Sequence, residues 1–211
     1  MKTIVYIDGF NLYYGCLKGT AHRWLNLHEL AQKMLPRDQI VGLRYFTALV
    51  QGRPSDPDAP ARQKTYLRAL ETLPDLEIHY GHFLTTKIRA MLVTPPKRGS
   101  GAVEVWKTEE KGSDVNLATR LLVDGYEARY ELAVVVSNDG DLKAPIEQVR
   151  QVLSIPVGVL NPGKMRSRAL SPAELPSGSF YKPIRSGVLA ASQFPSEVVD
   201  GRGKFVKPSG W

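Results

Sequence analysis

Cysteine is almost absent from this 211-residue sequence, which contains only Cys16. A single cysteine cannot form an internal disulfide, and it cannot supply a cluster of thiolate ligands for zinc. Long hydrophobic runs are absent too. The apolar stretch at residues 3–7 ends at Asp8, which makes it too short for a signal peptide or a membrane span. We therefore expect a cytoplasmic protein whose first residues form a buried strand.

The sequence also lacks the glycine-rich phosphate loops of nucleotide-binding enzymes. Neither GxGxxG nor GxxxxGKS occurs, which argues against a dinucleotide-dependent or NTP-dependent enzyme. The composition is that of an ordinary soluble globular protein, with 43% hydrophobic and 23% charged residues. The chain is long enough for one domain with a sizeable core.

Positive charge is unevenly distributed along the chain. The net charge is +7, and residues 161–211 carry eight Lys or Arg against three Asp or Glu, a net +5 that leaves +2 for the rest. A basic segment on a nearly neutral body suits a polyanionic partner. A solvated basic surface would have the same composition, so charge alone leaves both interpretations open.

Strand-like and helix-like patterns alternate along the first 160 residues. Apolar, β-branched or alternating runs predict strands at residues 3–7, 41–50, 76–84, 87–93, 102–106, 132–136 and 156–160. Apolar residues at helical spacing predict helices at residues 27–35, 61–73, 115–123 and 142–153. The alternation predicts a three-layer α/β domain over residues 1–160, with a mainly parallel central sheet flanked by helices. Residues 161–211 are rich in Ser, Pro and Gly but hold apolar anchors, which predicts a basic arm docked on the same domain.

Four aspartates follow predicted strands or begin a predicted helix. Asp8 follows the first strand, and Asp139 and Asp141 follow the strand at residues 132–136. Asp114 begins a predicted helix. The carboxyl ends of parallel strands share one edge of a sheet, so we expect Asp8, Asp139 and Asp141 to meet there, and Asp114 to join them if its helix starts at the same edge. Crowded carboxylates need a compensating cation, and oxygen ligands favour Mg²⁺ or Mn²⁺ over zinc.

Helix capping is the alternative interpretation of these acids. Asp is a common N-cap and stabilises a helix by about 1 kcal/mol in that position. The segment Asp139-Gly140-Asp141 would then be only a turn followed by a cap. Capping and metal binding are compatible, so the alternative does not exclude a site. Two hard metal ions can activate water and stabilise both oxygens of an in-line phosphoryl displacement, which predicts a phosphodiesterase without a protein nucleophile.

Three segments carry recognisable patterns: residues 7–13 are IDGFNLY, residues 111–118 are KGSDVNLA, and residues 136–142 are VSNDGDL. They resemble the DGxN, KGxDVxLA and SxDxDF/L motifs of NYN domains, which are relatives of PIN nucleases. The ending KPSGW resembles the Lys-Pro-x-x-Trp terminus of a bacterial branch, the LabA-like group. Three motifs in the right order, over nearly the whole chain, make the resemblance specific.

The resemblance implies a PIN-like, Rossmann-like fold and Mg²⁺- or Mn²⁺-dependent hydrolysis of RNA. It implies Asp8, Asp114 and Asp139 as catalytic metal ligands. Asp141 would be a further ligand or would orient a water. Many relatives carry an acid six residues after the second-motif aspartate, where this chain has Arg120. That departure leaves open one metal instead of two, weak activity, a subgroup with other substrates, or a catalytically silent module that binds RNA, a nucleotide or a protein.

Polar and basic residues near the motifs are the predicted substrate contacts: Asn11, Lys111, Ser137, Asn138, Lys164, Arg166 and Arg168. Lys111 would neutralise a scissile phosphate, although a solvated surface lysine is equally compatible with the sequence. Lys97 and Arg98, in an expected exposed turn at residues 94–101, offer another contact to a phosphate backbone. The expected partner is single-stranded or structured small RNA. A homodimer is left open.

Overall fold

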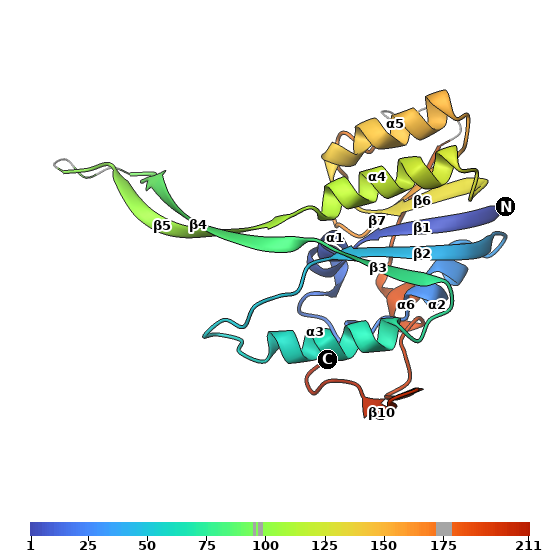
Figure 1. Cartoon of the computed structure of the whole chain (residues 1–211), viewed down its shortest axis with the longest axis horizontal. Coiled ribbons are helices and arrows are strands. Elements are labelled where there is room, and N and C mark those ends of the chain that lie inside the picture. The colour runs from blue at the N-terminus through green and yellow to red at the C-terminus, as the bar shows by residue number, and fades with distance from the viewer. Residues whose placement is uncertain (95, 97–98, 172–178) are drawn as a thin grey trace.

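The computed structural model describes residues 1–94, 96, 99–171 and 179–211. Its core is a six-stranded sheet in the order β3-β2-β1-β6-β7-β8, in which neighbouring strands run parallel. These strands are β1 (Lys2–Asp8), β2 (Gln39–Thr47), β3 (Leu76–Tyr80), β6 (Leu132–Val136), β7 (Val157–Asn161) and β8 (Phe180–Pro183). Helices cover both faces of the sheet (Figure 1), so the predicted three-layer α/β fold is confirmed.

The helices of the sandwich are α1 (Gly9–Leu12), α2 (Leu27–Met34), α3 (Ala59–Leu70), α4 (Ser113–Tyr126), α5 (Lys143–Val152) and α6 (Ser186–Ala190). Shorter elements and hairpins complete the described chain: η1 (Tyr13–Leu17), β4 (His82–Met91), β5 (Ala102–Lys111), η2 (Gly140–Leu142), β9 (Glu197–Asp200) and β10 (Gly203–Val206). None of the helices in the described segments combines the length and the apolar character needed to cross a bilayer.

Alternate residues of the first strand explain why the sheet is covered on both sides. Ile4 and Tyr6 belong to a buried cluster with residues of α4 and α5, and Val5 and Ile7 belong to another with residues of α2 and α3. Successive side chains of a strand point to opposite faces, so a strand that is apolar at every position needs a layer on each face.

The segment after β7 contributes to the same body. Its strand β8 extends the sheet beside β7, and its aromatic residues pack around the fully buried Trp24. The ring of Trp24 lies 5.6 Å from that of Phe194, 6.5 Å from Phe205 and 6.3 Å from Trp211, measured between centroids. The division of the chain into residues 1–160 and 161–211 stays a prediction.

The main departure from the predicted pattern occurs at Gly81. A single strand was predicted over residues 76–84, and this was wrong because β3 ends at Tyr80 and β4 leaves the sheet to pair with β5. A Cβ at Gly81 would lie 2.3 Å from Oε1 of Glu110 and 2.6 Å from the carbonyl oxygen of Lys111, so this close approach requires glycine. The resulting two-stranded ribbon projects from the body (Figure 1).

Candidate functional site

Asp8 lies at the carboxyl end of β1, where only 4% of the residue is exposed. Its carboxylate oxygens accept hydrogen bonds from the backbone N–H of Asn11 (2.9 Å) and the hydroxyl of Ser137 (3.0 Å). Burial raises the pKa of Asp8 to about 6, since the two hydrogen bonds only partly oppose the cost of burying its charge. The nearby carboxylates of Asp114 and Asp139 raise it further.

Hydrogen bonds join the end of β1 to the loop that follows β6. The backbone N–H of Asn138 donates to Oδ1 of Asn11 at 3.0 Å, and the backbone N–H of Asp139 donates to Oγ of Ser137 at 3.1 Å. Asp139 also accepts a hydrogen bond from the backbone N–H of Asp141 at 2.9 Å, which caps η2. Asp8, at the end of β1, and Asp139, after β6, therefore each cap a helix, and their carboxylates lie close together. We call this part of the sheet, with Asp8, Asp114 and Asp139, the acidic edge.

Asp114 joins this edge at the start of its helix. It lies in the first turn of α4, which follows the ribbon strand β5 and not a strand of the central sheet. Gly112 turns the chain into the helix with a φ of +97°, a conformation that favours glycine. Burial raises the pKa of Asp114 above its usual value, and the Asp139 carboxylate adds to the shift. Glu110 and Asp141 act in the same direction, so Asp114 lies close enough to the other three predicted acids to interact with them.

Glu110 is an acid of this edge that the motif analysis missed. It lies on β5, and its Oε1 accepts hydrogen bonds from the backbone N–H (3.1 Å) and the hydroxyl (2.8 Å) of Ser113. These bonds satisfy donors at the start of α4, which have no partner within the helix. The signal in the sequence was the acidic pair immediately before the second motif, in TEEKGSD at residues 108–114. Glu110 comes close to these aspartates only because of the ribbon of β4 and β5, which the sequence predicted only in part.

The basic residues predicted to contact substrate lie on the loop after β7 and are exposed: Lys164, Arg166 and Arg168. Asn138 holds this loop beside the acidic edge. Its Nδ2 donates to the carbonyl oxygen of Met165 at 3.0 Å, and its Oδ1 accepts from the backbone N–H of Ser167 at 2.8 Å. Lys111 is exposed at the end of β5, where its Nζ lies 3.6 Å from a carboxylate oxygen of Glu109. These basic residues thus lie on segments next to the acids, and the contacts named here do not pair them with Asp8, Asp114 or Asp139.

Arg120 takes part in a different group of charges. Its Nη2 lies 3.4 Å from Oε2 of Glu77 on β3, and its Nε lies 3.7 Å from Oδ1 of Asp124 on α4. It is six residues beyond Asp114 in the same helix, a rise of about 9 Å. Asp124 is fully buried. The arginine that stands at the position of the missing acid therefore binds charges between α4 and the sheet.

The donor chemistry of the acidic edge fits a hydrated hard cation. Asp8, Asp114 and Asp139 offer oxygen atoms alone, which suit Mg²⁺ or Mn²⁺. Among the described residues, no three or more His, Cys, Asp or Glu side chains are arranged to hold one metal ion together. Mg²⁺ usually keeps several waters and binds through one or two carboxylates, so it does not need an all-protein cage. The raised pKa values of Asp8 and Asp114, to which the neighbouring carboxylates contribute, are consistent with this fit.

Known proteins match this chain over most of its length. Residues 2–174 match the NYN domain family. The chain is 32% identical, over 237 aligned residues, to 6-hydroxy-3-succinoylpyridine 3-monooxygenase HspA of Pseudomonas putida, covering 100% of this chain and 75% of that protein. The solved structure of a protein of unknown function from Vibrio parahaemolyticus has a similar fold, with a TM-score of 0.54 and 14% identity over 88% of this chain and 94% of that one. From its sequence motifs, its parallel sheet and these matches, the chain belongs to the NYN domain family of the PIN-like superfamily.

Proposed function

We propose that this chain is a ribonuclease that uses Mg²⁺ or Mn²⁺ to hydrolyse RNA phosphodiester bonds. One observation carries the proposal: Asp8 and Asp114 both have raised pKa values, to which Asp114 and Asp139 contribute at Asp8, and Asp139, Glu110 and Asp141 contribute at Asp114. A divalent cation would relieve this repulsion, which is the usual reason for keeping several acids together. Membership of the NYN family, whose relatives are nuclease-like, supports the same function.

The acids have distinct roles in this proposal. Asp8, Asp114 and Asp139 would hold the ion, which supplies positive charge for the phosphate and a water of lowered pKa. Asp8 is buried and fixed by two hydrogen bonds, so its orientation is set before any ion arrives. Asp141 is exposed and its backbone is held by Asp139, which suits a role in orienting a water molecule.

The polar residues predicted to bind substrate fall into two groups. The side chains of Asn11, Ser137 and Asn138 already make hydrogen bonds within the edge, which favours a role in positioning the acids and the basic loop. The exposed cations of residues 164–168, and Lys111 at the end of β5, would contact RNA phosphates.

The direct test is cleavage of a labelled single-stranded RNA by the purified protein in Mn²⁺. We expect cleavage that EDTA abolishes, and a loss of roughly 1,000-fold or more in Asp8→Asn and in Asp139→Asn. Asp58→Asn is the matched control, because Asp58 is exposed in a loop and makes no capping hydrogen bond with its side chain. Circular dichroism establishes that each variant is folded. Metal-independent cleavage, or full activity in both site variants, would reject the proposal.

A catalytically silent binding module is the second candidate. Arg120 in place of an acid and the basic segment after residue 160 favour it. RNA binding that weakens with salt and persists without cleavage in any divalent cation would support this candidate over the nuclease. The LabA-like assignment, the cytoplasmic location and the homodimer stay predictions.

A third candidate comes from the similarity to the Pseudomonas putida protein, whose name describes a monooxygenase acting on 6-hydroxy-3-succinoylpyridine. The 32% identity spans this whole chain, which favours testing the same chemistry here. Oxygen uptake is measured with that compound, with reduced nicotinamide and flavin cofactors supplied. Substrate-dependent uptake in wild type, with no RNA cleavage under any metal condition, would favour this candidate over the nuclease.

A further inference from the structure

The ribbon of β4 and β5 starts at the acidic edge and projects away from the body (Figure 1). Its base contacts the candidate site. The ring of Phe83 on β4 meets that of Phe10 in the first motif edge to face, with centroids 5.7 Å apart. Glu110, which lies opposite Phe83 in the ribbon, accepts hydrogen bonds from the backbone N–H and the hydroxyl of Ser113, the residue directly before Asp114. One face of the ribbon is therefore continuous with the acidic edge.

Cross-strand partners in an antiparallel pair point to the same face, and the face alternates with each residue. We name the face that starts at Phe83 and Glu110 the Trp106 face; outward from that pair it contains Thr85–Thr108, Lys87–Trp106, Arg89–Glu104 and Met91–Ala102. Trp106 is 74% exposed, which leaves most of a large indole ring available to a partner. The hydroxyls of Thr85 and Thr108 hydrogen bond to each other at 2.9 Å. This small polar pair lies between the indole of Trp106 and the base of the ribbon.

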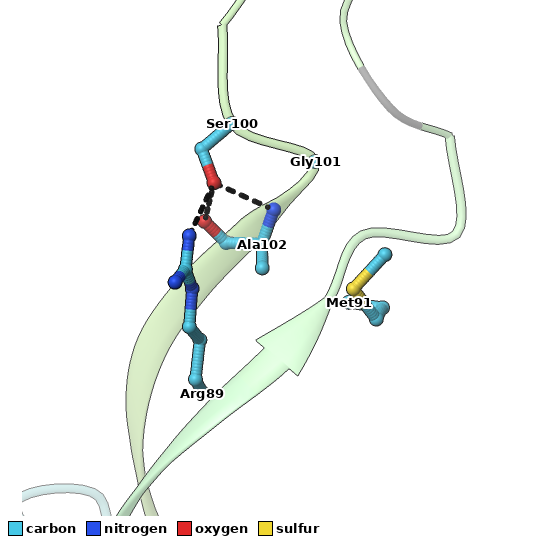
Figure 2. Close-up of a pocket in the computed structure, with 5 residues that line it drawn as sticks. All are labelled: Arg89, Met91, Ser100, Gly101 and Ala102. Atoms are coloured by element: carbon cyan, nitrogen blue, oxygen red, sulfur yellow. Dashed lines mark hydrogen bonds between the residues drawn. The ribbon is translucent and has the colours of Figure 1, made fainter.

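Two cations accompany Trp106 on this face. Lys87 lies directly opposite it and pairs with Glu104 at 2.7 Å, but both side chains of that pair are more than half exposed. Such a pair contributes little stability, so a phosphate can replace Glu104 at small cost. Arg89 lies one pair further out, where its Nη2 donates to Oγ of Ser100 at 3.0 Å; Figure 2 shows it extending along the strand toward that hydroxyl.

The opposite face of the ribbon differs in its outer half. It carries Ile88–Val105 and Ala90–Val103, which have neither charge nor an aromatic ring. In the outer half of the ribbon, the aromatic ring and the cations Lys87 and Arg89 therefore lie on the Trp106 face, whereas Lys107 on the opposite face lies nearer the base. Lys97 and Arg98, predicted to contact phosphates from the turn between the strands, lie outside the described residues.

We propose that the Trp106 face binds single-stranded RNA and directs it to the acidic edge, with a base stacked on Trp106 and phosphates bound by Lys87 and Arg89. An aromatic ring flanked by cations is the usual chemistry for binding single strands without regard to sequence. Trp106 lies four residues along β5 from Glu110, or about 13 Å, which about four stacked nucleotides span. This inference rests on the proposed function for its direction toward the acids, and its binding test is independent of cleavage.

The test is fluorescence anisotropy of a labelled single-stranded RNA of about 12 nucleotides, measured in EDTA so that no metal-dependent cleavage occurs. We expect Trp106→Ala to weaken binding about 10-fold or more. Val105→Thr, at the neighbouring residue on the opposite face, should bind like wild type. Lys87→Ala should weaken binding and lower the salt dependence by about one phosphate contact, whereas Lys107→Ala on the opposite face should have a smaller effect.

Failure of this inference and failure of the proposed function give different results. Wild-type binding by Trp106→Ala overturns the inference, whatever the catalytic assays show. Wild-type protein that cleaves neither RNA nor the small diester bis(p-nitrophenyl) phosphate in Mn²⁺ rejects the nuclease, whatever the ribbon binds. If Trp106→Ala instead lowers the molecular mass measured by light scattering while RNA binding is unchanged, the face is an interface between copies of the chain and the RNA inference is wrong.

Discussion

Asp8 and Asp124 are both buried carboxylates, but the charges around them differ. Asp8 is 4% exposed, and the charged groups that shift its pKa are other acids. Asp124 has no exposed surface, and its oxygens lie 3.5 Å from Arg44, 3.7 Å from Arg120 and 3.5 Å from Arg129. The negative charge of Asp124 is compensated by arginines of the protein, whereas that of Asp8 needs a proton or a cation from solution.

The difference separates a structural role from a functional one. Asp124 also accepts a hydrogen bond from the hydroxyl of Tyr6 on β1 at 2.9 Å, and Arg44 belongs to β2. Asp124 with Tyr6, Arg44, Arg120 and Arg129, here called the Asp124 cluster, therefore fastens α4 to two strands. A buried charge whose partners are part of the protein stabilises one arrangement, whereas an uncompensated one is free to exchange a bound cation.

The largest expected effect is on the Asp124 cluster. Asp124→Ala should lower the free energy of unfolding by about 3–5 kcal/mol, because three arginines lose their buried partner. Urea denaturation at pH 7 without metal measures this change. Asp8→Asn is the matched variant at the other acid and should not be destabilised. A loss below about 1 kcal/mol in Asp124→Ala would mean that solvent already compensates this cluster.

The second prediction concerns pH. The pKa of Asp8 in the folded protein is raised to about 6 from a usual value of 3.8, so the folded state holds a proton that the unfolded state has lost between these two values. Without metal, the contribution of Asp8 to stability should therefore fall as pH rises from about 4 to 6, by up to about 3 kcal/mol. Asp8→Asn should lose this slope and be more stable than wild type at pH 7. Equal slopes in the two proteins would contradict the raised pKa.

The third prediction is that a divalent cation replaces the missing compensation. Mn²⁺ at 100 times its dissociation constant should raise the free energy of unfolding of the wild type by about 2.7 kcal/mol, because it binds only the folded state. Thermal unfolding over a series of Mn²⁺ concentrations measures this. Asp8→Asn and Asp139→Asn should respond weakly, and Asp58→Asn should respond like wild type. An equal response in all four proteins would place the bound ion elsewhere.

The smallest expected effect is at Arg120. Arg120→Ala should cost about 1 kcal/mol, because its side chain is 31% exposed and its partners Glu77 and Asp124 keep their contacts with Arg44. RNA cleavage should be unchanged, since Arg120 binds charges away from the acidic edge. A 10-fold change in the rate of RNA cleavage by Arg120→Ala, with normal stability, would show that Arg120 affects the acidic edge.

Much of the fold could be predicted from local pattern. The pure apolar run at residues 132–136 coincides with β6, because a strand covered on both faces has no polar position. The prediction failed at residues 76–84, where strand-like residues continue across Gly81 although the chain leaves the sheet. Side-chain alternation does not reveal such a break, since both strands on either side of Gly81 have the same local pattern.

Sequence alone indicated that Asp8 and Asp139 follow buried strands of a parallel sheet, whereas the structure showed that these two strands, β1 and β6, are neighbours. Tertiary structure decided the rest of the edge: Asp114 arrives through the ribbon, Glu110 joins it, and Arg120 is bound elsewhere. The physical reason is the distance along the chain over which each interaction acts. Strand formation depends on residues close in the chain, whereas the charge around an acid depends on segments that only packing brings together.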